Sequence, residues 1–125
     1  MQVVAISSEG PSLEDAVDPR FGRAGGFVLA SYETDKAEPK ISYLDNGQAQ
    51  LLAQGAGIAT TELLAKAQVN VVLSGYVGPK AFEALEAAGI EVVQDLDGQT
   101  VGEALDKFRS GACKVASAPN REAGR

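Results

Sequence analysis

The stretch GAGIATTELLAKAQVNVVLSGYVGPKAFEALEAAGIEVV (residues 55–93) decides the fold. Small and apolar residues at helical spacing predict a helix over about residues 56–67, and the apolar run at 69–74 predicts a strand behind it. Pro79 favours the first position of a second helix, because the N–H that proline lacks has no partner there. The apolar run at 90–93 predicts another strand. Strands that alternate with helices are typical of an α/β fold.

Three apolar runs before this stretch predict three more strands, at residues 2–7, 27–32 and 41–44. The polar segment at 33–38 makes the second and third of them a hairpin. With right-handed crossovers, the strands are expected in the order 3-2-1-4-5, with strand two antiparallel to its neighbours. The sequence therefore predicts a single-domain α/β fold in which three helices flank a five-stranded mixed sheet.

The third of these helices begins at a capping box, Thr100-x-x-Glu103, and Gly111 ends it. The residues that follow are small and polar, which is typical of a flexible tail. We therefore expect one domain over residues 1–111 and a flexible C-terminal tail over residues 112–125.

The composition excludes several kinds of function. The 125 residues carry a formal net charge of -6, which disfavours nucleic acid as a partner, because phosphate binding needs a basic face. The chain has no histidine and one cysteine, Cys113, so the usual metal-ligating side chains and histidine-dependent catalysis are not expected. No apolar run is long enough to cross a membrane, and no signal peptide is recognisable. We expect a cytoplasmic monomer.

Three glycine-rich segments follow strands that end at one edge of the predicted sheet. They are DPRFGRAGGF (18–27), the segment over 46–57, and GYVG (75–78). In open α/β sheets, ligands bind beyond the carboxyl ends of the strands where the strand order reverses, here between strands one and four. The three segments are therefore expected to converge on a ligand site.

Arg20 and Arg23 are the clearest candidates in these segments. Guanidinium groups make several hydrogen bonds to oxyanions and other diffuse anions. Gly22 lies between them and allows close approach of the backbone. The alternative is an ordinary surface loop whose arginines pair with Asp15 and Asp18, and the residues alone leave both interpretations open.

The other two segments each precede a predicted helix, whose free N–H groups and dipole attract anions. Taken alone, each is better explained by plain turn chemistry. Together with the first loop they give one candidate binding set. It comprises Arg20, Phe21, Gly22, Arg23, Ala24, Gly55, Ala56, Gly57, Ile58, Gly75, Tyr76, Val77 and Gly78.

The residues VDPRFGRAGGFVL (17–29) and the stretch over 55–92 resemble the dinitrogenase iron–molybdenum cofactor-binding domain family. The similarity extends to about residue 111, and FGRA together with GYVGPKAFEAL (75–85) is a specific combination. The resemblance implies a ribonuclease-H-like α/β fold. It also implies a small carrier of metal–sulfur clusters rather than a catalyst.

Within that family, VDPRFGR is most similar to the orange proteins. This similarity implies a molybdenum–copper sulfide cluster that is held without covalent protein ligands. The nitrogenase branch often has histidine directly before F-G-R, where this chain has Arg20. A thiometallate anion brings its own sulfide ligands, so the protein would supply hydrogen bonds, positive charge and apolar walls.

The sequence therefore predicts a non-enzymatic carrier for an anionic molybdenum-containing sulfide cluster, with a protein donor or acceptor as a further partner. Arg20 and Arg23 would supply charge, with Arg23 the more important of the two, and glycine amides would supply donors. Phe21, Ile58 and Tyr76 would exclude water. The alternative is an interaction or regulatory domain that binds a protein or a small phosphate-bearing metabolite through the same loops.

Overall fold

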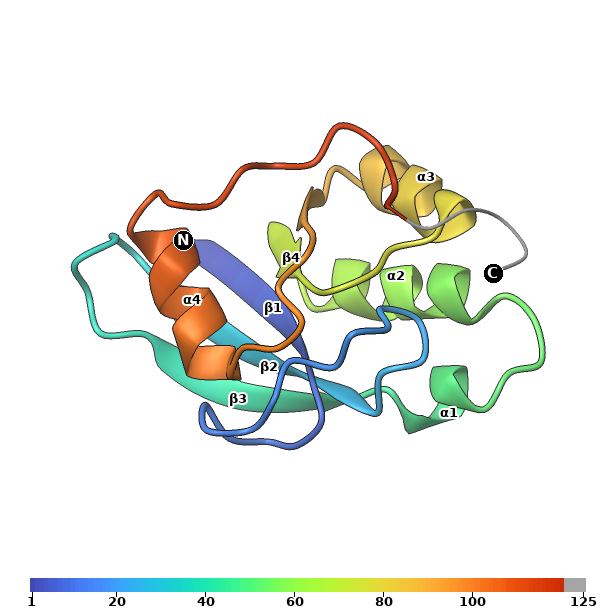
Figure 1. Cartoon of the computed structure of the whole chain (residues 1–125), viewed down its shortest axis with the longest axis horizontal. Coiled ribbons are helices and arrows are strands. Elements are labelled where there is room, and N and C mark those ends of the chain that lie inside the picture. Colours follow the sequence, from blue (N-terminus) through green and yellow to red (C-terminus); the bar gives the residue numbers. More distant parts are fainter. Residues whose placement is uncertain (121–125) are drawn as a thin grey trace.

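The structure, a computed structural model, describes residues 1–120. Its strands form one five-stranded sheet in the order β3-β2-β1-β4-β5. The strands are β1 (Gln2–Ser8), β2 (Gly26–Tyr32), β3 (Lys40–Asp45), β4 (Val71–Leu73) and β5 (Glu91–Val93). The helices are α1 (Gly47–Gln50), α2 (Ala56–Lys66), α3 (Pro79–Ala87) and α4 (Val101–Arg109) (Figure 1).

The strand pairing agrees with the order that the sequence predicts. β2 runs antiparallel to both β1 and β3, whereas β4 runs parallel to both β1 and β5. The α/β class, the mixed sheet and the antiparallel second strand are therefore confirmed. The strand order reverses between β1 and β4, and a ligand site is expected beyond their carboxyl ends.

The predicted number of helices is wrong. The described residues form four helices rather than three, because α1 lies inside a segment that the sequence indicates as a loop. α1 is a single turn, closed by the Gln50 N–H, which donates to the Asn46 carbonyl at 3.0 Å. One turn is too short to show a repeating apolar pattern. Over residues 1–120, no helix has the length and apolar character needed to cross a membrane.

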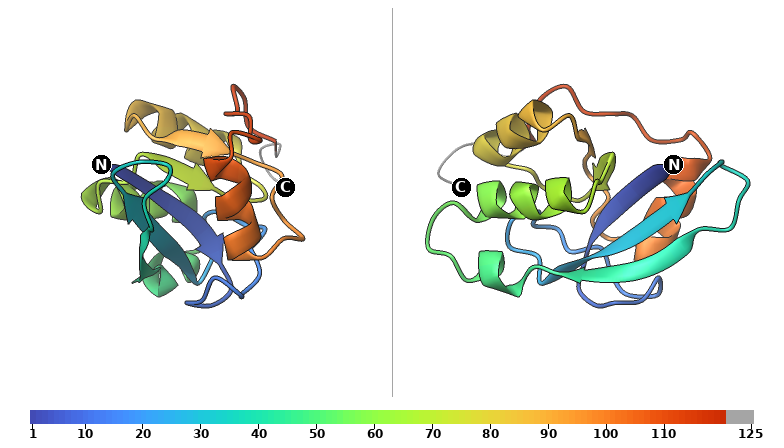
Figure 2. Two further views of the ribbon diagram at one scale, coloured as in Figure 1. Left: turned by 90° about the vertical axis from the view of Figure 1, so that its left-hand side faces the viewer. Right: turned by 180° about the vertical axis from the view of Figure 1, so that it is seen from behind.

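Helices cover both faces of the sheet (Figure 1 and Figure 2). On one face, Leu64 of α2 and Phe82 of α3 pack into one hydrophobic cluster. On the other face, Val101 and Leu105 of α4 belong to a second cluster. β1 contributes to both, which explains why residues 3–8 are all buried and why the strand reads as a continuous apolar run.

The capping box of α4 provides a test of local stability. The Thr100 hydroxyl accepts from the Glu103 N–H at 3.1 Å, and the Glu103 carboxylate accepts from the Thr100 N–H at 2.8 Å. We expect Thr100→Ala to lower the free energy of unfolding by about 1 kcal/mol, because an N–H of the first turn loses its partner. Urea denaturation measures this change. Glu103→Gln keeps an acceptor oxygen and should cost less; an equal cost would contradict the capping role.

The segment after α4 runs back across the molecule toward the start of α3 (Figure 1). The Ala116 N–H donates to the Val92 carbonyl at 2.7 Å, and the Gln94 side chain donates to the Ala118 carbonyl at 3.0 Å. We call residues 112–120 the C-terminal arm. The division into a domain over 1–111 and a flexible tail over 112–125 stays a prediction, and residues 121–125 lie outside the described residues.

Candidate functional site

The β1–β2 loop and the β4–α3 loop lie side by side beyond the ends of β1 and β4. The Phe21 N–H donates to the Tyr76 carbonyl at 3.1 Å, and the Tyr76 N–H donates to the Pro19 carbonyl at 2.5 Å. Arg20 and Tyr76 form a parallel bridge. The two loops therefore continue the pairing of β1 with β4 and hold Arg20 at the point where the strand order reverses.

Three glycines make the close approach of these segments possible. A Cβ on Gly22 would lie 2.9 Å from the Gly57 nitrogen, and a Cβ on Gly57 would lie 2.7 Å from the Ala81 Cβ. On Gly75, a Cβ would lie 2.7 Å from the Pro19 carbonyl oxygen. The first turns of α2 and α3 thus touch each other, and the β1–β2 loop lies against them. The structure brings the three glycine-rich segments together.

The two helix starts at this place have little to neutralise their N–H groups. α2 begins after Gly55, which has a left-handed backbone with φ of 78°, and α3 begins after Gly78. Neither helix has a side-chain cap or an acidic residue in its first turn. The N–H groups of a first turn have no intrahelical partner and carry partial positive charge. Their arrangement suits an anion.

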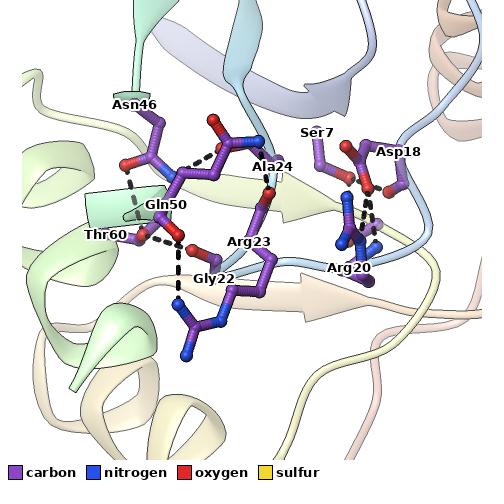
Figure 3. Close-up of polar contacts among 10 residues, drawn as sticks. Ser7, Asp18, Arg20, Gly22, Arg23, Ala24, Asn46, Gln50 and Thr60 are labelled. Carbon is purple, nitrogen blue, oxygen red and sulfur yellow. Dashed lines mark hydrogen bonds and ion pairs between the residues drawn. The ribbon is translucent and has the colours of Figure 1, made fainter. Parts of the chain in front are cut away.

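Arg23 makes no ion pair within residues 1–120, and its side chain points toward the connection between α1 and α2 (Figure 3). Its guanidinium donates to the Gln50 carbonyl at 3.0 Å, to the Ala53 carbonyl at 3.4 Å and to the Leu52 carbonyl. In return, the Gln50 side chain donates to the Arg23 carbonyl at 3.0 Å. Arg23 therefore fixes the chain that leads into α2.

Asn46 provides a second connection between the same elements (Figure 3). Its side-chain nitrogen donates to the Ala24 carbonyl at 2.9 Å, and its oxygen accepts from the Thr60 hydroxyl at 3.1 Å. The candidate set from the sequence did not include Asn46, Gln50 or Thr60. A signal existed in the sequence for Asn46 alone, since a polar residue directly after β3 lies at the edge where the loops meet. The structure shows that this residue is buried.

Arg20 pairs with Asp18, as the alternative interpretation of this loop expects. Its Nε lies 3.6 Å from an Asp18 carboxylate oxygen, and its side chain is 58% exposed. Asp18 itself is buried and its carbonyl accepts from the Ser7 hydroxyl at 2.7 Å. Asp15 instead accepts from the Ser12 N–H at 2.8 Å. The Arg20 side chain therefore lies at the surface of the site, and it pairs with Asp18, which is itself buried and hydrogen-bonded to β1.

The candidate side chains divide between core and surface. Phe21, Ala24 and Val77 are buried, with exposed fractions of at most 2%, so these side chains belong to the core. Phe21 packs edge to face against Phe27, with ring centroids 5.7 Å apart. Ile58, by contrast, is 44% exposed. Of the residues predicted to exclude water, Ile58 has a side chain exposed enough to contact a ligand. The Phe21 side chain is in the core, and its backbone pairs with Tyr76.

Cys113 packs against the hydrophobic cluster on the α4 face of the sheet. Burial raises the pKa of its thiol, and the Lys107 ammonium lowers it by a smaller amount. We expect iodoacetamide at pH 8 to alkylate the Cys113 thiol more slowly than it alkylates the thiol of free glutathione. The thiolate is the nucleophile, and a raised pKa reduces the fraction of Cys113 that is thiolate. Mass spectrometry measures the rate of Cys113 alkylation. Unfolding the protein in urea should raise this rate to that of an exposed thiol. Equal rates in folded and unfolded protein would contradict this expectation.

Residues 1–111 match the profile of the family described as dinitrogenase iron-molybdenum cofactor. This chain belongs to that family. The recognition made from the sequence motifs is thereby confirmed. This chain is also 28% identical to an uncharacterized protein from Methanocaldococcus jannaschii. The similarity extends over 82 residues, which are 66% of this chain and 68% of that protein.

Two solved structures extend the comparison over nearly the whole chain. The apo form of the orange protein from Desulfovibrio gigas is 51% identical, with a TM-score of 0.89 and coverage of 97% of this chain and 98% of that chain. A Thermotoga protein of the DUF35 family is 32% identical, with a TM-score of 0.75 and the same coverage. The family member described here therefore shares its architecture with both.

Proposed function

We propose that this protein binds and carries an anionic metal–sulfide cluster that contains molybdenum, and that it does so without catalysing a reaction. The observation that carries the proposal is the meeting of two uncapped helix starts beside Arg20, at the edge where the strand order reverses. Family membership and 51% identity with an orange protein support the same conclusion.

The chemistry of the site suits a cluster that keeps its own ligands. The chain has no histidine and one cysteine, and Cys113 packs against the cluster on the α4 face of the sheet. Backbone N–H groups of α2 and α3 can donate to sulfides, and Arg20 supplies positive charge. Ile58 offers exposed apolar surface next to these donors. A diffuse sulfide anion would thus be held by hydrogen bonds, charge and apolar contact.

The finer parts of the proposal go beyond the family. We propose a molybdenum–copper sulfide cluster, held without covalent protein ligands and exchanged with a protein donor or acceptor. The ribonuclease-H-like classification, the cytoplasmic location and the monomeric state stay predictions.

A reconstitution experiment tests the proposal. Purified protein is incubated with tetrathiomolybdate, with and without Cu(I), and then desalted; bound molybdenum and copper are measured by mass spectrometry and visible absorption. We expect retained molybdenum, and more of it when Cu(I) is present. Lys36→Ala removes a positive charge from the exposed β2–β3 turn at the far end of the sheet and should retain as much as wild type. No retained molybdenum in wild type would overturn the proposal.

Thermal unfolding distinguishes a metal–sulfide ligand from the alternative ligand, a phosphate-bearing metabolite. A ligand that binds only the folded state raises the unfolding midpoint. We expect thiomolybdate to raise the midpoint, and inorganic phosphate and nucleotides to leave it unchanged. A rise with a nucleotide and none with thiomolybdate would favour the alternative.

A further inference from the structure

Residues 75–77 continue the line of β4, and their backbone groups have different hydrogen-bond partners on the two sides. On the edge toward β1, both backbone groups of Tyr76 pair with the β1–β2 loop. Backbone groups alternate in direction along an extended chain. The Gly75 carbonyl and the Val77 N–H therefore face the opposite edge, the one toward β5.

The chain after β5 covers only part of that opposite edge. Asp95 has a left-handed backbone, with φ of 66°, so the chain turns away there. Its N–H donates to the Gly75 carbonyl at 3.0 Å. Of the backbone groups in residues 1–120, none accepts from the Val77 N–H across this edge. A partner for Val77 must come from elsewhere.

The side chain of Asn120 in the C-terminal arm is that partner. Its oxygen accepts from the Val77 N–H at 2.9 Å, and its nitrogen donates to the Gly75 carbonyl at 2.8 Å and to an Asp95 carboxylate oxygen at 2.9 Å. A carboxamide presents one acceptor and one donor side by side, as a peptide group of a neighbouring strand does. Asn120 thus completes the pairing of residues 75–77.

The arm holds this amide in place through Gln94. The Gln94 side chain donates to the Ala118 carbonyl at 3.0 Å and accepts from the Asn120 N–H at 3.1 Å. The arm also lies beyond residues 1–111, the part that matches the family profile. The family profile therefore does not describe this contact.

We propose that Asn120 is a positioning residue of the cluster site, a role that rests on the function proposed above. It fixes Gly75 and Val77 on one edge, so that Tyr76 keeps its pairing with the β1–β2 loop on the other. That pairing sets where Arg20 and the start of α3 stand. Loss of the amide loosens the site without removing any group that touches the cluster.

The test compares Asn120→Ala and Asn120→Asp with wild type. The carboxylate in Asn120→Asp would keep the shape and an acceptor for Val77 but could not donate to the Gly75 carbonyl when ionised. Ser117→Ala is the matched control, because Ser117 is exposed in the same arm and its side chain makes no hydrogen bond within residues 1–120. Amide hydrogen exchange, thiomolybdate retention and the thermal midpoint are measured for each protein.

For Asn120→Ala, we expect exchange at Val77 and Phe21 to rise about twofold to tenfold, the range for one lost hydrogen bond. Asn120→Asp keeps an acceptor for the Val77 N–H, so exchange at Val77 should rise less. Thiomolybdate retention should fall by a similar factor, while exchange in β1 and the thermal midpoint stay at wild-type values. A purely structural role would lower the midpoint and raise exchange in β1 as well.

Two outcomes of the retention measurement would also overturn the proposal, and they are distinguishable. If wild type and both Asn120 variants retain thiomolybdate equally, Asn120 does not position the site and the proposed function stands. If wild type retains none, the proposed function fails and the role of Asn120 fails with it.

Discussion

Arg23→Ala should reduce thiomolybdate retention by about 10- to 100-fold, the equivalent of about 1.5–3 kcal/mol for hydrogen bonds to a charged group. The guanidinium donates to the carbonyls of Gln50, Leu52 and Ala53, all in the connection that leads to Gly55 and the start of α2. Without it, this connection is free to move, and the N–H groups at the start of α2 lose their fixed position.

The comparison with other substitutions makes this expectation specific. Arg23→Lys should recover only part of the loss, because a point charge cannot reach three carbonyls as a planar fork does. Arg20→Ala should cost less, since Arg20 is 58% exposed and its ordering on a ligand costs conformational entropy. Amide exchange in residues 50–53 should rise in Arg23→Ala and stay unchanged in Arg20→Ala. Wild-type retention by Arg23→Ala would show that Arg23 does not fix the start of α2 for binding.

The architecture of the sheet could be predicted because its signals are local. Each strand is an apolar run of its own, and glycine or proline marks where a helix begins or ends, as at Pro79 and Gly111. Handedness rules then leave one plausible strand order. The convergence of the three loops followed from that order and needed no knowledge of side-chain contacts.

The contacts that shape the site could not be predicted, because their partners are distant in sequence and lack a pattern. Arg23 bonds to carbonyls some 27 to 30 residues away, and any residue type supplies a carbonyl. Asn120 lies in a segment whose composition indicates a flexible tail, and its partners Val77 and Gly75 are 43 and 45 residues away in the sequence. α1 depends on such contacts too, since one helical turn is not stable alone.

The sequence assigned both arginines as donors to the ligand, and that assignment stays a prediction. The structure adds that the Arg23 guanidinium donates to the backbone of the α1–α2 connection. Its importance for binding stays a prediction, now with a different physical reason. Arg20, the more exposed of the two, is the arginine that can reach a ligand with its side chain.

Gly22→Ala should have the second large effect, because the new methyl group meets backbone. A Cβ there would lie 2.9 Å from the Gly57 nitrogen, 3.0 Å from the Gly57 Cα and 3.3 Å from the Ala56 carbonyl carbon. No side-chain rotation relieves such contacts, so the loop must move away from α2. We expect a loss of about 1–3 kcal/mol in the free energy of unfolding, as for other overpacked sites.

Retention of thiomolybdate should fall in Gly22→Ala by about tenfold or more, since the same displacement separates Arg20 from the start of α2. Gly25→Ala is the matched control, because it adds the same methyl group to the same loop but meets only the Gln50 side chain, at 3.7 Å. Urea unfolding and molybdenum retention are measured for both. Gly25→Ala should behave as wild type in each. If the two variants lose retention equally, or neither does, close contact between Gly22 and α2 is not what builds the site.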